Sequence, residues 1–144
     1  MRIAALLLIA AALVSACREK PDYLTNMTRD QIIEMARKEP LQERYNIYKE
    51  VYNSDVPPET YLIPLVVEET DRAYALALQE ASTGSYLDIL AAIEVILHIN
   101  QQRKSKCRDE DLRRILTNLG NVSKDSKLNV IVGGEIRFAC RVGT

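Results

Sequence analysis

The sequence contains a single histidine, a residue type used for both acid–base chemistry and metal binding, and its neighbours decide what it could do. His98 follows Glu94 by four residues, so in a helix the two side chains share a face with Gln101. This pair supplies at most two metal ligands, whereas a zinc site needs three or four. The spacing therefore favours an exposed polar pair, and we expect neither a metal site nor a cofactor.

An acidic cluster is the second candidate for chemistry. Glu68, Glu69 and Asp71 supply carboxylates, and glycoside hydrolysis needs two that face each other. Adjacent residues of a helix diverge by about 100°, so the cluster is more typical of a solvated surface. The motifs G-x-S-x-G, H-E-x-x-H, C-x-x-C and G-x-x-x-x-G-K-[ST] are all absent from the sequence. We predict no catalytic residue, and an envelope hydrolase that uses Glu68, Glu69 or His98 is the weakest alternative.

The charge balance argues against nucleic acid as a partner. The 144 residues include 19 basic and 20 acidic side chains, a formal net charge of −1, without the basic excess of nucleic-acid-binding proteins. A basic run near residue 107 is more typical of a solvated helix end than of a site for anionic lipid or an acidic protein. Its members are Arg103, Lys104, Lys106, Arg108, Arg113 and Arg114.

The N-terminus has the features of an export signal. Arg2 precedes an unbroken apolar run of 12 residues from Ile3 to Val14. A helix needs about 20 residues to cross the hydrocarbon core of a membrane, so this run is too short. A basic start, a short apolar run and small residues at its end are typical of a secretory signal peptide.

The end of this segment, Val14-Ser15-Ala16-Cys17, resembles the lipobox of bacterial lipoproteins. The resemblance implies cleavage after Ala16, acylation of Cys17 with fatty acids such as palmitate, and a membrane-anchored chain over 17–144. In enterobacterial lipoproteins an Asp after the lipidated cysteine favours the inner membrane. Position 18 is Arg, so the resemblance implies an outer-membrane lipoprotein that faces the periplasm. An ordinary signal peptide with a cysteine nearby is the alternative.

The remaining cysteines, Cys107 and Cys140, are expected to form a disulfide. Exported proteins meet oxidising conditions, and two cysteines are left when Cys17 carries lipid. A catalytic thiol would need a base beside it, and His98 is the only histidine.

The pattern of the mature chain predicts a polar tether over 17–27 and a single all-α domain over 28–144. Thr28 with Gln31, and Ser85 with Asp88, have the spacing of capping boxes that begin helices. Prolines and glycines indicate where helices end, and Gly120 suits a position just after a helix. About six antiparallel helices are expected, over 28–39, 41–53, 58–81 with a kink or restart at Pro64, 85–103, 108–119 and 124–140.

Residues 124–140 fit two structures. The β-branched residues on both sides of Gly133-Gly134 are typical of a β-hairpin. The apolar residues also have helical spacing, and a lone hairpin would have no sheet to join. Three antiparallel helices would in addition bring Cys140 back to Cys107. We therefore favour a helix that forms a HEAT-like hairpin with the helix before it, and the β-hairpin is the alternative.

These observations predict a non-enzymatic protein that binds a protein partner. Tyr45, Tyr48 and Tyr52 recur on one helix face. Although such tyrosines usually pack at the edge of a core, they form our candidate contact surface, together with Asp55 in the break that follows. The partner would be an envelope machine or a secreted toxin. In layout only, a small exported helical domain with a cysteine pair resembles the immunity proteins of type VI amidase effectors. A structural tether between envelope layers is the other alternative.

Overall fold

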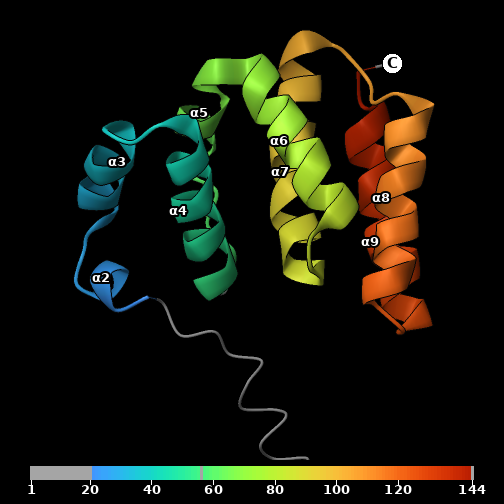
Figure 1. The fold of residues 1–144 in the computed structure, drawn as a ribbon, viewed down its shortest axis with the longest axis horizontal. Helices are drawn as coiled ribbons and strands as arrows, with labels where there is room; N and C mark the ends of the chain where they lie inside the picture. Colours follow the sequence, from blue (N-terminus) through green and yellow to red (C-terminus); the bar gives the residue numbers. More distant parts are fainter. Residues whose placement is uncertain (1–20, 56, 144) are drawn as a thin grey trace, which may run out of the picture.

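The computed structural model describes residues 21–55 and 57–143, and these residues form an all-α fold without a strand (Figure 1). The predicted fold class is therefore confirmed, and the alternative β-hairpin around Gly133-Gly134 is wrong. The lipobox and the predicted lipidation site Cys17 lie outside the described residues. The elements are α2 (Asp22–Thr25), α3 (Arg29–Arg37), α4 (Leu41–Ser54), α5 (Ile63–Val66), the 3₁₀ helix η1 (Val67–Glu69), α6 (Thr70–Thr83), α7 (Tyr86–Arg103), α8 (Asp109–Val122) and α9 (Ser126–Arg141).

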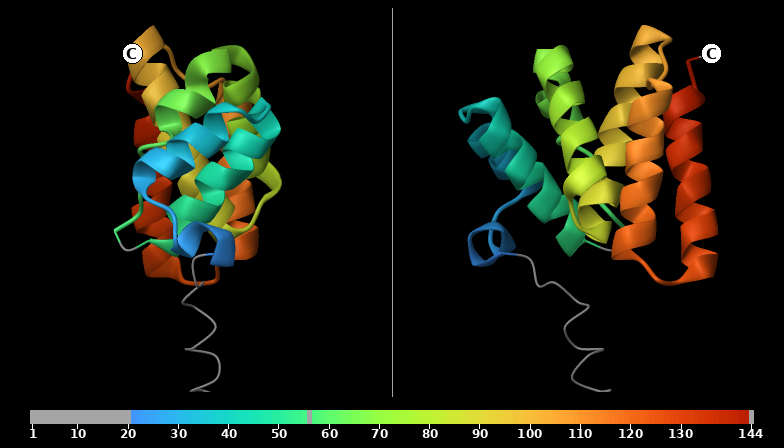
Figure 2. Two further views of the ribbon diagram at one scale, coloured as in Figure 1. Left: turned by 90° about the vertical axis from the view of Figure 1, so that its left-hand side faces the viewer. Right: turned by 45° about the vertical axis from the view of Figure 1, so that its right-hand side comes forward.

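The last four helices form a two-layer array. Helix α6 packs against both α7 and α8, and α9 packs against the same two helices. In the right-hand view of Figure 2, α6 to α9 run roughly along one direction, alternately up and down. The expected helical hairpin at the C-terminus is present as α8 and α9. Among the described helices, none is both long and apolar enough to span a membrane.

Local sequence signals begin several of these helices. The Thr28 side chain accepts a hydrogen bond from the Gln31 backbone amide, and the Gln31 side-chain oxygen accepts one from the Thr28 backbone amide, which completes a capping box. Ser85 and Asp88 form the second predicted box at the start of α7. Asp125 caps α9 by accepting hydrogen bonds from the amides of residues 127 and 128 at 2.9 and 3.1 Å.

Three predicted boundaries are wrong. The tether expected over 17–27 includes α2, whose Leu24 is fully buried. The helix expected over 58–81 does not start at residue 58; it begins at Ile63, beside the restart expected at Pro64, and it is divided into α5, η1 and α6. Pro64 occupies the first turn, where it costs no intrahelical hydrogen bond. Gly120 does not end α8, because its backbone is not in the left-handed region and the helix continues to Val122.

The core is centred on α7, as its apolar pattern predicts. Isoleucines 89, 96 and 99 of this helix are fully buried, and so are Ala91 and Ala92. On α6, the side chains of Ala73, Ala77 and Ala81 are completely buried as well. Small side chains on one face permit close approach of α6 to its neighbours, and this compact array is the support on which α9 lies.

Candidate partner-binding site on helix α9

Helix α9 is apolar on two sides, and only one side is buried. Its inner residues Val132, Ile136 and Ala139 are nearly inaccessible to solvent. On its outer side Val130, Ile131 and Phe138 keep 75%, 62% and 59% of their surface exposed. These three lie on one helix face, because positions 130, 134 and 138 are four residues apart and 131 lies seven before 138. We call them the outer apolar face.

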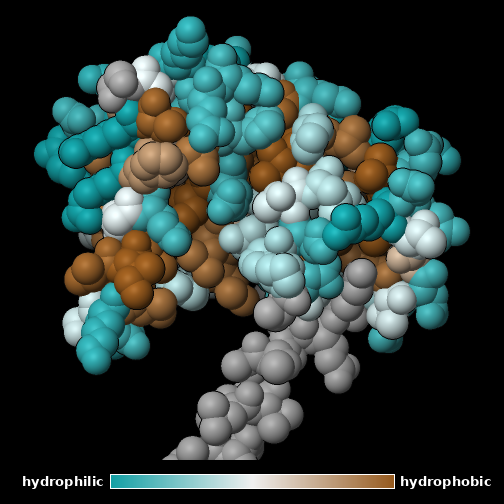
Figure 3. All heavy atoms as spheres, turned by 180° about the vertical axis from the view of Figure 1, so that it is seen from behind, coloured by the Kyte–Doolittle hydropathy of each residue, from teal (hydrophilic) through white to brown (hydrophobic). Residues whose placement is uncertain are grey.

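A groove runs along this face between α7 and α9. Its volume is about 400 Å³. In the view from behind, hydrophobic side chains form a band on the side of the molecule where α9 lies (Figure 3). The lining residues come from α7 and α9 only: Ile93, Glu94, Leu97, Ile131, Gly134, Glu135, Phe138 and Ala139.

Two neighbouring glycines of α9 have different surroundings. A Cβ atom added to Gly133 would lie 3.1 Å from the Nη1 atom of Arg137 and 3.8 Å from a methyl carbon of Leu116. Gly133 therefore faces Leu116 of α8 at an ordinary contact distance, and a side chain there would also displace the end of Arg137. A Cβ atom added to Gly134 would meet no atom within 4 Å, because this residue opens into the groove. Gly134 thus forms a notch in the outer apolar face.

Both charged residues that line the groove are acidic. Burial raises the pKa of Glu94 above its ordinary value, and the neighbouring carboxylate of Glu135 raises it further. Tyr52 lies close by, and burial followed by the same two carboxylates raises its pKa to about 12. Within the described part of the chain, neither Glu94 nor Glu135 has a cationic side chain in ion-pair contact. The groove therefore combines apolar walls with uncompensated negative charge.

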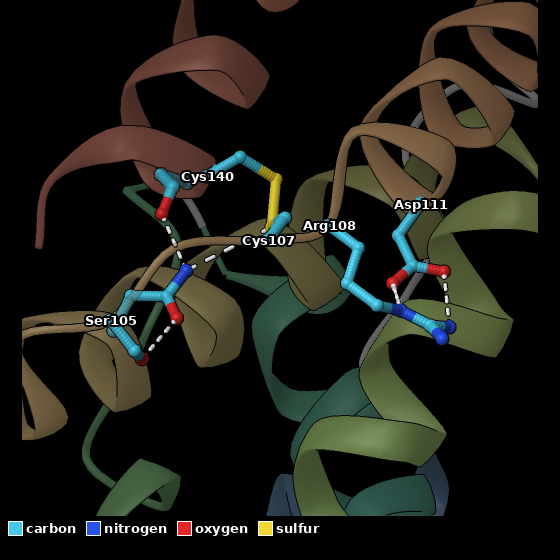
Figure 4. Close-up of a disulfide and its surroundings, with 7 residues drawn as sticks. Ser105, Cys107, Arg108, Asp111 and Cys140 are labelled. Atoms are coloured by element: carbon cyan, nitrogen blue, oxygen red, sulfur yellow. Dashed lines mark hydrogen bonds and ion pairs between the residues drawn. A yellow bond between two sulfur atoms is a disulfide. The ribbon is translucent and has the colours of Figure 1, made fainter. Parts of the chain in front are cut away.

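The C-terminal end of α9 is fixed to the end of α7 and the start of α8. Cys107 and Cys140 form the predicted disulfide (Figure 4), and the Cys107 amide donates a hydrogen bond of 2.9 Å to the Cys140 carbonyl. The fully buried Asn100 adds a second link, because its Nδ2 atom donates to the Ala139 carbonyl at 2.9 Å. Its Oδ1 atom accepts a hydrogen bond of 2.8 Å from the Ser105 hydroxyl.

The tyrosine surface predicted from the sequence is wrong. Tyr45 and Tyr48 are fully buried, and Tyr52 is only 8% exposed. Tyr48 donates a hydrogen bond of 2.7 Å to the Ala91 carbonyl, and its ring packs against both other tyrosines. These side chains connect α4 to α7 and are part of the core. Asp55 is half-buried just after α4, so it does not extend an exposed tyrosine face.

The candidate acid–base residues make ordinary structural contacts. His98 lies 3.1 Å from Gln102, measured between their Nε2 atoms. The nearly buried guanidinium of Arg44 holds Glu68 at 2.9 Å and Glu69 at 3.1 Å, and it also donates to the Leu65 carbonyl. Across residues 21–55 and 57–143, no three His, Cys, Asp or Glu side chains are grouped in a way that could hold a metal ion.

Three members of the basic run form ion pairs with acidic side chains. Arg103 contacts Asp71 at 2.7 Å, Arg108 binds Asp111, and Arg114 pairs with Glu110. A polar groove of about 970 Å³ lies beside these arginines, between α6 and α8. Both carboxylates of its lining, Glu110 and Asp111, are already in ion pairs, whereas, among the described residues, those of the groove along α9 are not.

The α9 site could have been found only in part from the sequence. Its signal is an apolar pattern that covers more than one helix face, with Val130, Ile131 and Phe138 beside the residues that are buried. The pattern does not say which face is buried.

In comparisons with known proteins, no family model matches the chain, and neither a curated protein nor a solved structure is significantly similar to it.

Proposed function

We propose that this protein is a non-enzymatic lipoprotein of the bacterial envelope that binds a protein partner through the outer apolar face of α9. The exposed cluster of Val130, Ile131 and Phe138 beside the groove carries this proposal. Contiguous apolar surface on a small domain is typical of interaction sites, and aromatic anchors are enriched at interface centres. The lipobox resemblance supports the membrane anchor at Cys17 and an outer-membrane location facing the periplasm.

The proposed partner is a component of an envelope machine or a secreted toxin that this protein inhibits. Both roles need a compact surface that survives export, and the disulfide-linked α8–α9 hairpin supplies one. The hydrolase alternative has less support, because Arg44 engages Glu68 and Glu69 in ion pairs. A purely structural tether would not account for the exposed residues of the outer apolar face.

Photo-crosslinking in cells tests this proposal. A photoreactive amino acid replaces Val130 in the full chain, and a second version carries it at Glu34, an exposed residue of α3. We expect a discrete adduct with one protein from position 130 and none of that mass from position 34. The substitution Phe138→Ser should remove the adduct, since truncating a central aromatic anchor weakens binding by roughly 10- to 100-fold.

A matched substitution controls for nonspecific effects. Val122 is also an exposed hydrophobic residue, at 41%, but it lies on α8. Val122→Ser should leave the adduct unchanged. Equal labelling from positions 34 and 130, or the absence of any adduct, would refute the proposed function.

A further inference from the structure

Nothing within this molecule requires a glycine at position 134. It is in the interior of α9, where glycine is destabilising relative to alanine. No glycine of the described chain has a positive φ angle, so the backbone does not require glycine there. A Cβ atom would meet nothing within 4 Å, so packing does not require it either. The missing side chain leaves a notch in the outer apolar face, and another backbone can approach α9 closely there.

The charges of the groove indicate which kind of side chain its ligand carries. Glu94 and Glu135 are the charged residues of its lining, and the other lining side chains are apolar, apart from the bare backbone of Gly134. A cationic side chain in the groove would compensate these carboxylates in a partly desolvated setting, where such pairing is stronger than at an open surface.

A second copy of this chain fits these charges poorly. In a two-fold symmetric contact the same patch of both copies meets, and residues beside the symmetry axis lie close to their own copies. Centred on Gly134, such a contact would bring Glu94 and Glu135 of one copy towards the same carboxylates of the other. This like-charge contact favours a different protein as the occupant.

We infer that the groove receives an amphipathic helix of the partner protein, which crosses α9 at Gly134 and places a lysine or arginine against Glu94 and Glu135. This inference rests on the proposed function and specifies its partner. Helix-in-groove binding uses apolar anchors spaced three or four residues apart, and the outer apolar face provides matching contacts. The helix axes of packed helices are about 8–10 Å apart, and small residues at the crossing allow the shortest separations.

A displayed library of helical peptides, selected on the immobilised full chain, tests the inference. We expect enriched peptides to share apolar residues at helical spacing, a small residue at the centre and a lysine or arginine nearby. Replacing that basic residue by glutamate in a synthetic peptide should weaken binding at least tenfold. Gly134→Leu should also weaken binding at least tenfold, because its side chain fills the notch.

Two controls separate binding from folding. Leucine favours a helix over glycine, so circular dichroism should show that the Gly134→Leu variant is folded. Gly120 lies on the exposed side of α8, and a Cβ atom there also meets nothing within 4 Å. Gly120→Leu should therefore leave peptide affinity unchanged.

Several outcomes would overturn the inference. These are peptides without a basic preference, equal binding to the Gly134→Leu variant, no enriched helical peptide, or a dimer in sedimentation velocity that Gly134→Leu dissociates. If the crosslink from position 130 persists in any of these cases, the proposed function stands and only the helical, basic partner is wrong. Absence of the crosslink from the chain whose only change is the photoreactive residue at position 130 would instead refute the proposed function itself.

Discussion

Removing the disulfide should destabilise the fold by an amount that follows from the position of the bond. Cys107 and Cys140 are separated by 33 residues in the sequence. For a loop of this size, the loss of chain entropy in the unfolded state gives about 3.8 kcal/mol of stabilisation at 25 °C. We therefore expect the double variant Cys107→Ala/Cys140→Ala to lose about 3 to 4 kcal/mol in its free energy of unfolding. That is a large share of the roughly 5–15 kcal/mol typical of a domain.

Urea unfolding followed by circular dichroism at 222 nm measures this loss, because the described domain is all-α. The wild-type protein is compared with the double variant, each with and without a thiol reductant. Reductant should lower the stability of the wild type to that of the variant and leave the variant unchanged.

Two results would refute the reasoning. A loss below about 1 kcal/mol would mean that the reduced chain already holds residues 107 and 140 together when unfolded. An effect of reductant on the double variant would mean that the bond between these cysteines is not the one that matters.

Further substitutions test the buried contacts and the groove. Asn100→Ala should destabilise the domain by about 2–3 kcal/mol in urea unfolding, since it leaves buried polar groups without partners. Arg44→Ala should lower stability by about 2 kcal/mol, because the Glu68 carboxylate and the Leu65 carbonyl lose their Arg44 contacts, although Glu69 keeps its ion pair with Arg72. Gly120→Ala and Gly134→Ala should each raise stability by up to about 1 kcal/mol, and only the second should weaken binding of a selected peptide. Glu94→Gln should raise the thermal unfolding midpoint at pH 7. The folded-state pKa of Glu94 is raised above the ordinary value of 4.5, so the ionised carboxylate costs stability as pH rises through that range. Below pH 4 the two proteins should unfold at the same temperature.

Local rules in the sequence predicted much of the architecture. The capping boxes at Thr28 and Ser85 depend only on residues three apart, and both are present. The helix over 124–140 followed from the lack of any sheet for a hairpin to join. Helix ends were less predictable, because Gly120 permits a stop but does not require one when the backbone stays helical.

The candidate site was not predictable in the same way. Periodicity places Tyr45, Tyr48 and Tyr52 on one face of α4, but it does not say whether that face meets solvent or another helix. The contact between Tyr48 and the Ala91 carbonyl joins residues 43 apart in sequence. Helix α9 presents the opposite case: it has apolar residues on two sides, and only its packing against α7 and α8 decides that Phe138 remains exposed.

The two restraints on α9 have a consequence for recognition. The Asp125 side chain holds the first turn, and the disulfide at Cys140 holds the last. A binding surface that is preorganised in this way loses little conformational entropy when a partner arrives, so more of the contact free energy appears as affinity. The disulfide would then act on binding from a distance. Reducing it should speed dissociation of the partner even though neither cysteine lines the groove.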